Sequence, residues 1–163
     1  MDEHCQILCE RMHEVDASIE YVDFLGRNRL EVNFEGEFGV YARATRWEVE
    51  SLRRLECVDN TPRVLRVYNE GSDDWCIPLI RSFFPGRMLN LVDVDMKSLA
   101  GDAFDLVKRI HGAGVVTRDL KYDNFVYGKD GLSFVDFSQG CLDDMKEFEK
   151  AKEAELEELY RLF

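Results

Sequence analysis

The sequence predicts an α+β fold in which a small antiparallel sheet with one helix is followed by a mostly helical part. Three observations lead to this prediction. Residues 19–42 contain three extended segments, which turn residues separate. Pro85 and Gly86 break the last strand of this first part. Beyond that break, residues 98–111 place their apolar side chains at helical spacing.

The central strand of the first part alternates clearly. Leu30, Val32 and Phe34 lie on one face and polar residues on the other, as expected of a strand with one buried face. The segment Glu35-Gly36-Glu37 then favours a tight turn between antiparallel neighbours. The elements predicted here are a helix over 2–14, strands over 19–25, 30–34 and 38–42, a helix over 46–57, and strands over 64–68 and 77–84.

The second part consists mainly of two predicted helices. Leu99, Leu106 and Ile110 share the apolar face of the first, and Gly112 and Gly114 cap its end. The second helix is strongly charged, with a ragged apolar edge that either covers the core or offers a surface to a protein partner. The elements predicted here are a helix over 98–111, short strands over 115–116, 125–127 and 132–135, and a helix over 142–163.

Composition limits the classes of protein to which the chain can belong. Its 163 residues are about the length of one domain. Lys and Arg number 21 against 33 Asp and Glu, a formal charge of −12 that argues against nucleic-acid or anionic-membrane binding but allows a local phosphate site. We find no membrane-spanning or signal-peptide pattern. The five cysteines form no CxxC pair, which favours an intracellular, cytoplasmic protein without zinc.

The residues that indicate chemistry lie between positions 118 and 136. Phosphoryl transfer from ATP needs an Asp that accepts or orients the acceptor's proton, an Asn and a second Asp for magnesium, and a cation that neutralises the transferred group. Asp119 and Asn124 have the spacing D-x-x-x-x-N. Lys121 is placed to face the γ-phosphate. Asp136 follows an apolar strand and precedes Phe137, as a metal-binding Asp in a D-F-x turn would.

These motifs resemble those of the protein-kinase-like superfamily over about residues 30–140. The chain looks most like the minimal kinase-like proteins of fungi, some of which are grouped with aminoglycoside or choline phosphotransferases. Arg118-Asp119-Leu120-Lys121 is the protein-kinase form of the loop, whereas small-molecule kinases usually have His-Gly-Asp there. Thr117 stands where either group has a histidine, and Asp136-Phe137-Ser138 stands for Asp-Phe-Gly.

The resemblance also implies a nucleotide site. Residues 80–89 resemble the hinge between two lobes, where Ser82, Phe83 and Phe84 would pair with the adenine edge. Arg43 stands in place of the phosphate-binding lysine, with Glu48 as its ion-pair partner and Glu50 as the second choice. The glycine-rich loop is absent in its usual form. Residues 36–39 are either its remnant or a β-turn, and we prefer the turn.

The resemblance implies a single two-lobed kinase-like domain over residues 1–163. Its reduced first lobe would cover about 15–83, its hinge about 82–87 and its minimal, mostly helical second lobe about 87–163.

The function that follows is ATP–Mg²⁺-dependent phosphoryl transfer to a hydroxyl, in the manner of a protein serine/threonine kinase. Asp119 would be the base and Lys121 the charge stabiliser, with Asn124 and Asp136 as the metal ligands. A small-molecule phosphotransferase is an alternative, which the short chain after Asp136 favours. Because Arg43 replaces the usual lysine, a pseudokinase that binds nucleotide or a protein partner is another. The acceptor, a protein or a small molecule, is not identified by the sequence.

Overall fold

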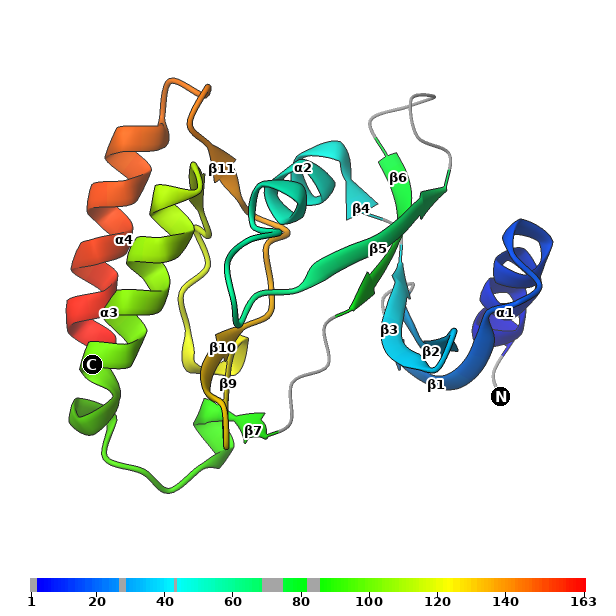
Figure 1. Ribbon diagram of the computed structural model, residues 1–163, viewed down its shortest axis with the longest axis horizontal. Helices are drawn as coiled ribbons and strands as arrows, with labels where there is room; N and C mark the ends of the chain where they lie inside the picture. The colour runs from blue at the N-terminus through cyan, green and yellow to red at the C-terminus, as the bar shows by residue number, and fades with distance from the viewer. Residues whose placement is uncertain (1–2, 27–28, 43, 69–74, 82–85) are drawn as a thin grey trace.

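The computed structural model describes residues 3–26, 29–42, 44–68, 75–81 and 86–163. A sheet part, from α1 to β6, lies beside a helical part, from β7 to α4 (Figure 1). The elements are, in chain order, α1 (Glu3–Val15), β1 (Glu20–Gly26), β2 (Arg29–Phe34), β3 (Glu37–Ala42), β4 (Ala44–Thr45), α2 (Arg46–Arg54), β5 (Arg63–Tyr68), β6 (Trp75–Arg81), β7 (Arg87–Met88), η1 (Leu89–Leu91), α3 (Met96–Gly112), β8 (Val115–Val116), η2 (Tyr122–Asn124), β9 (Phe125–Gly128), β10 (Gly131–Phe134), β11 (Cys141–Leu142) and α4 (Phe148–Leu162).

The sheet of the first part is antiparallel throughout. β1, β2 and β3 are neighbours in chain order, and β6 pairs with β3 and β4 on one edge and with β5 on the other. Between β2 and β3, Phe34 pairs with Glu37 across a turn in which Glu35 and Gly36 have φ values of 53° and 83°. Gly39 lies within β3, opposite Val32. The β-turn interpretation of residues 36–39 is therefore confirmed.

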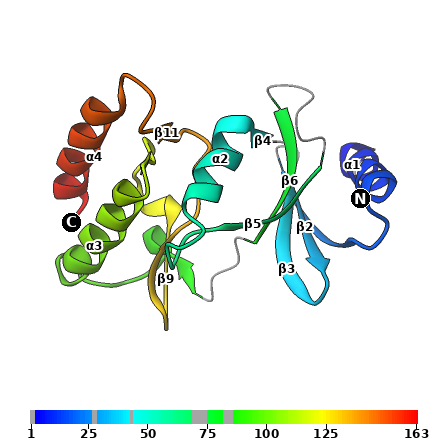
Figure 2. The same cartoon turned by 45° about the horizontal axis from the view of Figure 1, so that its top comes forward.

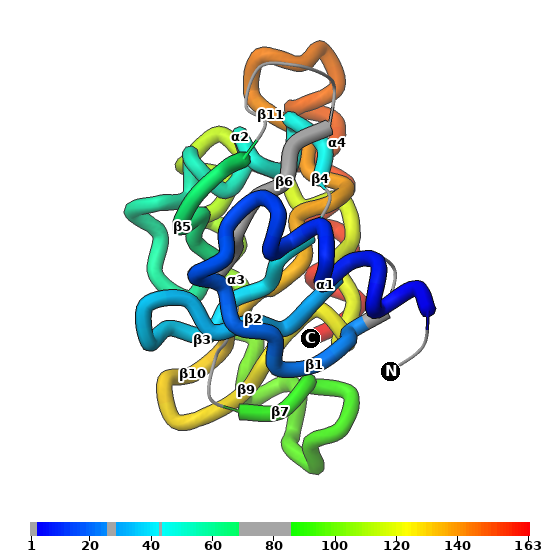
Figure 3. Tube along the Cα trace, turned by 90° about the vertical axis from the view of Figure 1, so that its right-hand side faces the viewer, coloured from blue at the N-terminus to red at the C-terminus, as the bar shows by residue number. Residues whose placement is uncertain are grey.

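Helix α1 covers one face of this sheet, as the view from its side shows (Figure 3). Leu30, Val32 and Phe34 are buried on that face together with Cys9 and Met12 of the helix. Because side chains alternate along a strand, Arg29, Glu31 and Asn33 belong to the opposite face. That face is turned toward the helical part (Figure 1).

Helix α2 lies between the two parts of the molecule (Figure 2). Thr45 caps it, because its Oγ1 accepts a hydrogen bond at 3.2 Å from a backbone N–H of the first turn. The helix ends at Arg54, which corrects the predicted helix over 46–57. Beyond it, Asn60 adopts a φ of 66° and Thr61 Oγ1 donates to a carbonyl of the same turn at 2.7 Å. These turn contacts replace the helical hydrogen bonds.

The helical part shares its core with α2. Leu52 of α2 and Leu55, which directly follows the helix, pack in one buried cluster with the helical part. The cluster includes Leu106 of α3 and Phe125 and Phe134 of the β9–β10 hairpin. Where the chain enters this part, Gly86 has a φ of 153°, and a Cβ there would lie 2.4 Å from the carbonyl oxygen of Tyr127. Only glycine fits that approach.

The charged helix at the C-terminus begins later than the sequence predicts. Instead of a helix over 142–163, α4 starts at Phe148, and Cys141–Leu142 forms the strand β11, which pairs with β8. The N–H of Asp143 continues this pairing by donating to the carbonyl of Gly114 at 3.1 Å. Pairing with a buried strand therefore prevails over local helix propensity in this segment.

Two further expectations can be compared with the described residues. No helix within them is both long enough and apolar enough to cross a bilayer. Cys5, Cys9, Cys57 and Cys141, the cysteines whose side chains the structure describes, form no disulfide bond.

Asp16, just after α1, joins that helix to the sheet. Its carboxylate accepts hydrogen bonds from the backbone N–H of Ser18 at 3.0 Å and from the hydroxyl of Tyr68 at 2.7 Å, and it forms an ion pair with Arg66 at 3.0 Å. The side-chain hydrogen bond from Ser18 and the bond from Tyr68 are the main causes that lower the pKa of Asp16 to about 2.

This low pKa predicts a pH-dependent contribution to stability. Because the folded pKa lies below the unfolded value of about 4, the stabilisation is present above pH ~4 and is lost as the pH falls toward 2. We expect Asp16→Asn to lower the thermal midpoint at pH 7, and the difference from the unchanged protein to shrink below pH 4. Asp105→Asn, at an exposed carboxylate of α3, is the control. If Asp16→Asn lowered the thermal midpoint equally at pH 7 and below pH 4, the stabilisation would not come from the charge of Asp16.

Candidate active site

Asp119 and Asn124 lie in the loop that runs from β8 into η2. Asn124 is buried, and its Nδ2 donates to the backbone oxygen of Asp119 at 2.9 Å and to the carboxylate Oδ2 at 3.0 Å. The amide group is thereby oriented, because its nitrogen end faces Asp119. The amide oxygen is left as the end that can bind a cation.

Lys121 completes this group. Its Nζ lies 3.0 Å from Oδ2 of Asp119, the oxygen that Asn124 also contacts. The hydrogen bond and the charge of Asp119 raise the pKa of Lys121, and Asp136 and Asp123 add smaller effects in the same direction. Among the described residues, none donates a hydrogen bond to the other oxygen, Oδ1. Oδ1 is therefore the carboxylate oxygen that can accept a hydrogen bond from a substrate hydroxyl.

Asp136 lies next to this loop because the two backbones are joined. The N–H of Val135 donates to the carbonyl of Asn124 at 3.0 Å. The next residue after Asp136, Phe137, is buried, with its ring centroid 5.2 Å from that of Phe134. Asp136 itself is half-buried, and its Oδ1 accepts a hydrogen bond from the N–H of Ser138 at 2.9 Å. Ser138 is not among the described residues with positive φ, so this turn forms without a glycine.

The structure distinguishes the two glutamates of α2. Glu50 bonds to Arg54 on its own helix at 3.4 Å. Glu48 is half-buried, and burial raises its pKa, with Arg29 acting to lower it and Asp136 to raise it further. Glu48 is therefore close enough to Asp136 for their charges to interact. Arg43, its predicted partner, lies outside the described residues.

Arg29 is a cation of this region that the sequence reasoning missed. It is the first residue of β2, opposite Ala42 at the end of β3, and it belongs to the sheet face turned toward the helical part. The alternation of β2 was the available signal, since it separates Arg29 from the buried Leu30. The predicted adenine contacts Ser82, Phe83 and Phe84 lie outside the described residues and remain predictions.

A buried carboxylate on α4 forms hydrogen bonds with the loop that precedes Asp119. Glu155 accepts hydrogen bonds from the N–H of Arg118 at 2.8 Å, from the N–H of Thr117 at 3.2 Å and from the Thr117 hydroxyl. Nε2 of His111, at the end of α3, lies 2.7 Å from the same carboxylate. Side-chain exposure is 2% for Glu155 and 4% for His111, so both groups are removed from solvent.

This contact compensates for an unusual backbone. Arg118 has a φ of 60°, a conformation that costs a non-glycine residue roughly 1–3 kcal/mol. Its N–H is held by Glu155, and the N–H of the next residue, Asp119, points to Thr117 Oγ1 at 3.4 Å. The strained turn presents Asp119 outward. Sequence reasoning missed Glu155, although its position between Ala151 and Leu159 places it on the inner stripe of α4.

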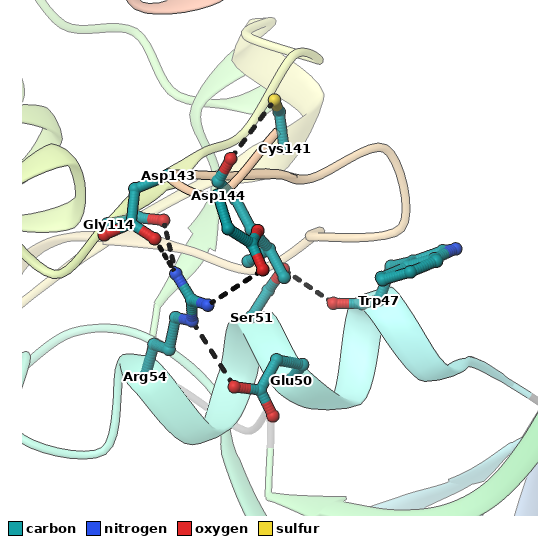
Figure 4. A network of polar contacts seen from close by, with 9 residues as sticks. Trp47, Glu50, Ser51, Arg54, Gly114, Cys141, Asp143 and Asp144 are labelled. Atoms are coloured by element: carbon teal, nitrogen blue, oxygen red, sulfur yellow. Dashed lines mark hydrogen bonds and ion pairs between the residues drawn. The ribbon is translucent and has the colours of Figure 1, made fainter. Parts of the chain in front are cut away.

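Arg54 connects α2 to the turn before β8 and to the segment after β11 (Figure 4). Its guanidinium contacts the carboxylate of Asp143, the carbonyl oxygen of Gly114 at 3.4 Å, and Asp144 at 3.9 Å. Gly114 has a φ of 79°, and a Cβ there would lie 2.6 Å from Asp143 Oδ2. Glycine is therefore needed at this junction, which fixes α2 against the segment that precedes Thr117.

A pocket opens beside Asp119 on the side of α4. It has a volume of about 580 Å³ and is lined by loop residues 118–120 and by residues of α4 and the turn before it. This volume lies in the range of small-molecule sites. The candidate base therefore forms part of the wall of a cavity.

The candidate metal ligands fit a magnesium that arrives with phosphates. Within the described part of the chain, no cluster of three or more His, Cys, Asp or Glu side chains is placed to hold a metal. Asn124 and Asp136 offer an amide oxygen and a carboxylate, which are hard oxygen donors. Magnesium commonly binds one or two protein carboxylates, and phosphates and water complete its coordination.

Comparison with known proteins bears on the fold. A scan of protein-family models and a search of curated proteins each found no match. Among solved structures, the chain is similar to the Cydia pomonella granulovirus kinase PK-1, with a TM-score of 0.62 and 12% sequence identity. The match covers 84% of this chain and 57% of that kinase. The chain therefore has a protein-kinase-like α+β fold, and it spans little more than half the length of that kinase.

The contacts of Glu155 predict its effect on stability. Glu155→Ala leaves the Thr117 and Arg118 donors and His111 without their partner in a buried place, and we expect the free energy of unfolding to fall by about 3–5 kcal/mol. Chemical denaturation measures this change. Glu153→Ala, at an exposed position of the same helix, is the matched control and should change it by less than about 0.5 kcal/mol. Equal losses of unfolding free energy in the two variants would show that the buried contacts of Glu155 do not stabilise the fold more than an exposed side chain does.

Proposed function

We propose that this protein transfers the γ-phosphoryl group of ATP to a hydroxyl acceptor, in the manner of a protein serine/threonine kinase. The observation that carries the proposal is the joining of Asp119, Lys121 and Asn124 through one carboxylate oxygen. The backbone bond between Asn124 and Val135 adds Asp136 to the same place. These are the parts that phosphoryl transfer requires.

Asp119 acts as the base in this proposal. Lys121 and Asn124 hold Oδ2, and Oδ1 accepts the proton of the acceptor hydroxyl. The acceptor oxygen then forms its bond to the γ-phosphorus as the bond from that phosphorus to the bridging oxygen breaks, and ADP leaves with this oxygen. Lys121 is about half exposed, at 49%, so its ammonium is free to exchange the carboxylate for a phosphate oxygen when nucleotide binds. It then neutralises charge on the transferred group.

Asn124 and Asp136 would hold the magnesium ion, with the amide oxygen and the carboxylate as ligands. Magnesium held there would supply positive charge that neutralises the phosphates of the nucleotide. Arg43 and Glu48 would anchor the α and β phosphates, and Ser82, Phe83 and Phe84 would contact adenine. Burial raises the pKa of Glu48, and the nearby charge of Asp136 raises it further. This interaction supports a position of Glu48 beside the proposed metal ligand Asp136.

A small-molecule phosphotransferase, related to the aminoglycoside or choline type and to the minimal proteins of fungi, is the second candidate. The pocket beside Asp119 favours it, because a concave site of about 580 Å³ suits a compact ligand better than an extended peptide. A pseudokinase would bind nucleotide through the same residues without turnover.

The role of Asp119 can be tested by a substitution that keeps its size. We expect Asp119→Asn to retain nucleotide binding and to lower turnover by about 10²- to 10⁴-fold, because the amide cannot take the proton. ADP formation with mixed hydroxyl acceptors measures turnover, and a thermal shift with ATP measures binding. Asp123→Asn, an exposed carboxylate in the same loop, is the control. Equal turnover in Asp119→Asn and the unchanged protein would rule out this base.

The metal assignment has a separate test. Asp136→Ala removes a proposed ligand, so the part of the ATP-induced thermal shift that depends on magnesium should be largely lost. Asp130→Ala, in the exposed β9–β10 turn, should keep the full shift. An unchanged magnesium effect in Asp136→Ala would contradict the assignment. A normal shift without turnover in the unchanged protein would favour the pseudokinase.

A further inference from the structure

We infer that Arg29 of β2 binds the phosphates of the nucleotide beside Glu48, as a cation of the site that no sequence motif assigns. The inference rests on the proposed function and adds a binding residue to the same site. Its basis is the position of Arg29 on the sheet, the course of the chain from β3 into α2, and the charges around both.

Arg29 lies on the face of the sheet that α1 does not cover. Leu30, the next residue, is buried against α1, so Arg29 belongs to the opposite face, which is turned toward the helical part (Figure 1). Its partners across the sheet are Gly26 of β1 and Ala42 of β3. Neither partner has a side chain long enough to cover the guanidinium, and Arg29 is exposed. A ligand between the two parts can therefore reach it.

The chain runs from the partner of Arg29 into α2 within a few residues. After Ala42 at the end of β3, the short strand β4 leads directly into the helix. Val49, in the second half of the first turns, packs with Ala44 of β4 and so holds the start of α2 against the sheet. Glu48, the residue before it, is half-buried. The first turn of α2 is thereby kept near the end of β3, where Arg29 is paired.

Electrostatic effects agree with this arrangement. Burial raises the pKa of Glu48, the charge of Arg29 acts to lower it, and the charge of Asp136 raises it. One carboxylate of α2 thus interacts with a cation from the sheet and with a proposed metal ligand from the helical part. Arg29, Glu48 and Asp136 therefore border the same space between the two parts.

Arg29 has no ion-pair partner in the part of the chain that the structure describes. Glu31 lies two residues along the same face, and neither it nor Glu48 forms an ion pair with Arg29. A nucleotide bound beside Asp136 would bring phosphate oxygens into this space. A guanidinium is planar and can bind two such oxygens at once, so it suits a phosphate better than a point charge does.

The affinity for nucleotide tests this role without relying on turnover. Calorimetry with magnesium present measures Kd for ATP and for ADP. We expect Arg29→Gln to raise both Kd values by about tenfold or more, because charged hydrogen bonds to phosphate are lost. Arg29→Lys keeps the charge but not the fork, and it should recover part of the affinity.

Arg11→Gln is the matched control, because Arg11 is an exposed arginine of α1, which covers the other face of the sheet (Figure 3). It should leave Kd unchanged. Equal Kd values for ATP in Arg29→Gln and Arg11→Gln would overturn the inference. If Arg29→Gln lowered the thermal midpoint of the nucleotide-free protein, Arg29→Lys would decide: no recovery of affinity in a variant with the unchanged midpoint would overturn the inference as well.

A double-mutant cycle tests whether Arg29 acts together with Glu48. Glu48→Gln is combined with Arg29→Gln, and Kd for ATP is measured for each variant and for the pair. If both side chains act on the same phosphates, the loss in the double variant should be smaller than the product of the separate losses. Losses that multiply would show that Arg29 does not act beside Glu48.

Failure of this inference can be told from failure of the proposed function. Turnover that depends on Asp119, with ATP affinity that does not depend on Arg29, would overturn the inference and keep the function. ATP binding that Arg29→Gln weakens, without turnover of any acceptor, would keep the inference and reject the enzyme in favour of the pseudokinase. Absence of nucleotide binding in the unchanged protein would overturn both.

Discussion

The candidate site depends on one buried interaction, the contacts of the Glu155 carboxylate. A carboxylate so removed from water must be matched by hydrogen-bond donors or by positive charge. Thr117 and Arg118 supply the donors from the loop, and His111 supplies a ring nitrogen from the end of α3. The helix α4, the helix α3 and the loop are therefore fixed at one point. Asp119 is the next residue in the chain after Arg118, so the hydrogen bond between Glu155 and the N–H of Arg118 helps to orient it.

Two further sets of contacts connect the loop and the segments beside it to the rest of the molecule. The bond from Val135 to Asn124 places the strand before Asp136 against the loop. Arg54 holds α2 to Gly114 and Asp143, and Leu52 of the same helix packs in the core of the helical part. A helix of the sheet part is thus packed and ion-paired with the helical part. This coupling explains how Glu48, which precedes β5 and β6 in the chain, comes to interact with Asp136.

The fold and the site support the functional proposal with different strength. Likeness at 12% identity to a viral kinase shows the architecture, and one architecture can host different activities. The proposal therefore relies on the contacts of Asp119, on the oxygen donors of Asn124 and Asp136, and on the pocket.

The sequence by itself determined the features that depend on near neighbours. The alternation of β2, the turn at Gly36, the span of α3 and the spacing of Asp119 and Asn124 are all local, because periodicity and turn chemistry act over a few residues. Tertiary structure decided the rest. Residues 142–147 leave the predicted helix because β11 pairs with β8, and Glu155 becomes the central anchor of the loop although its own helix reads as a charged cover. The reason is physical: a buried carboxylate is stabilised by donors from another part of the chain, and its own neighbours in sequence do not reveal which donors those are.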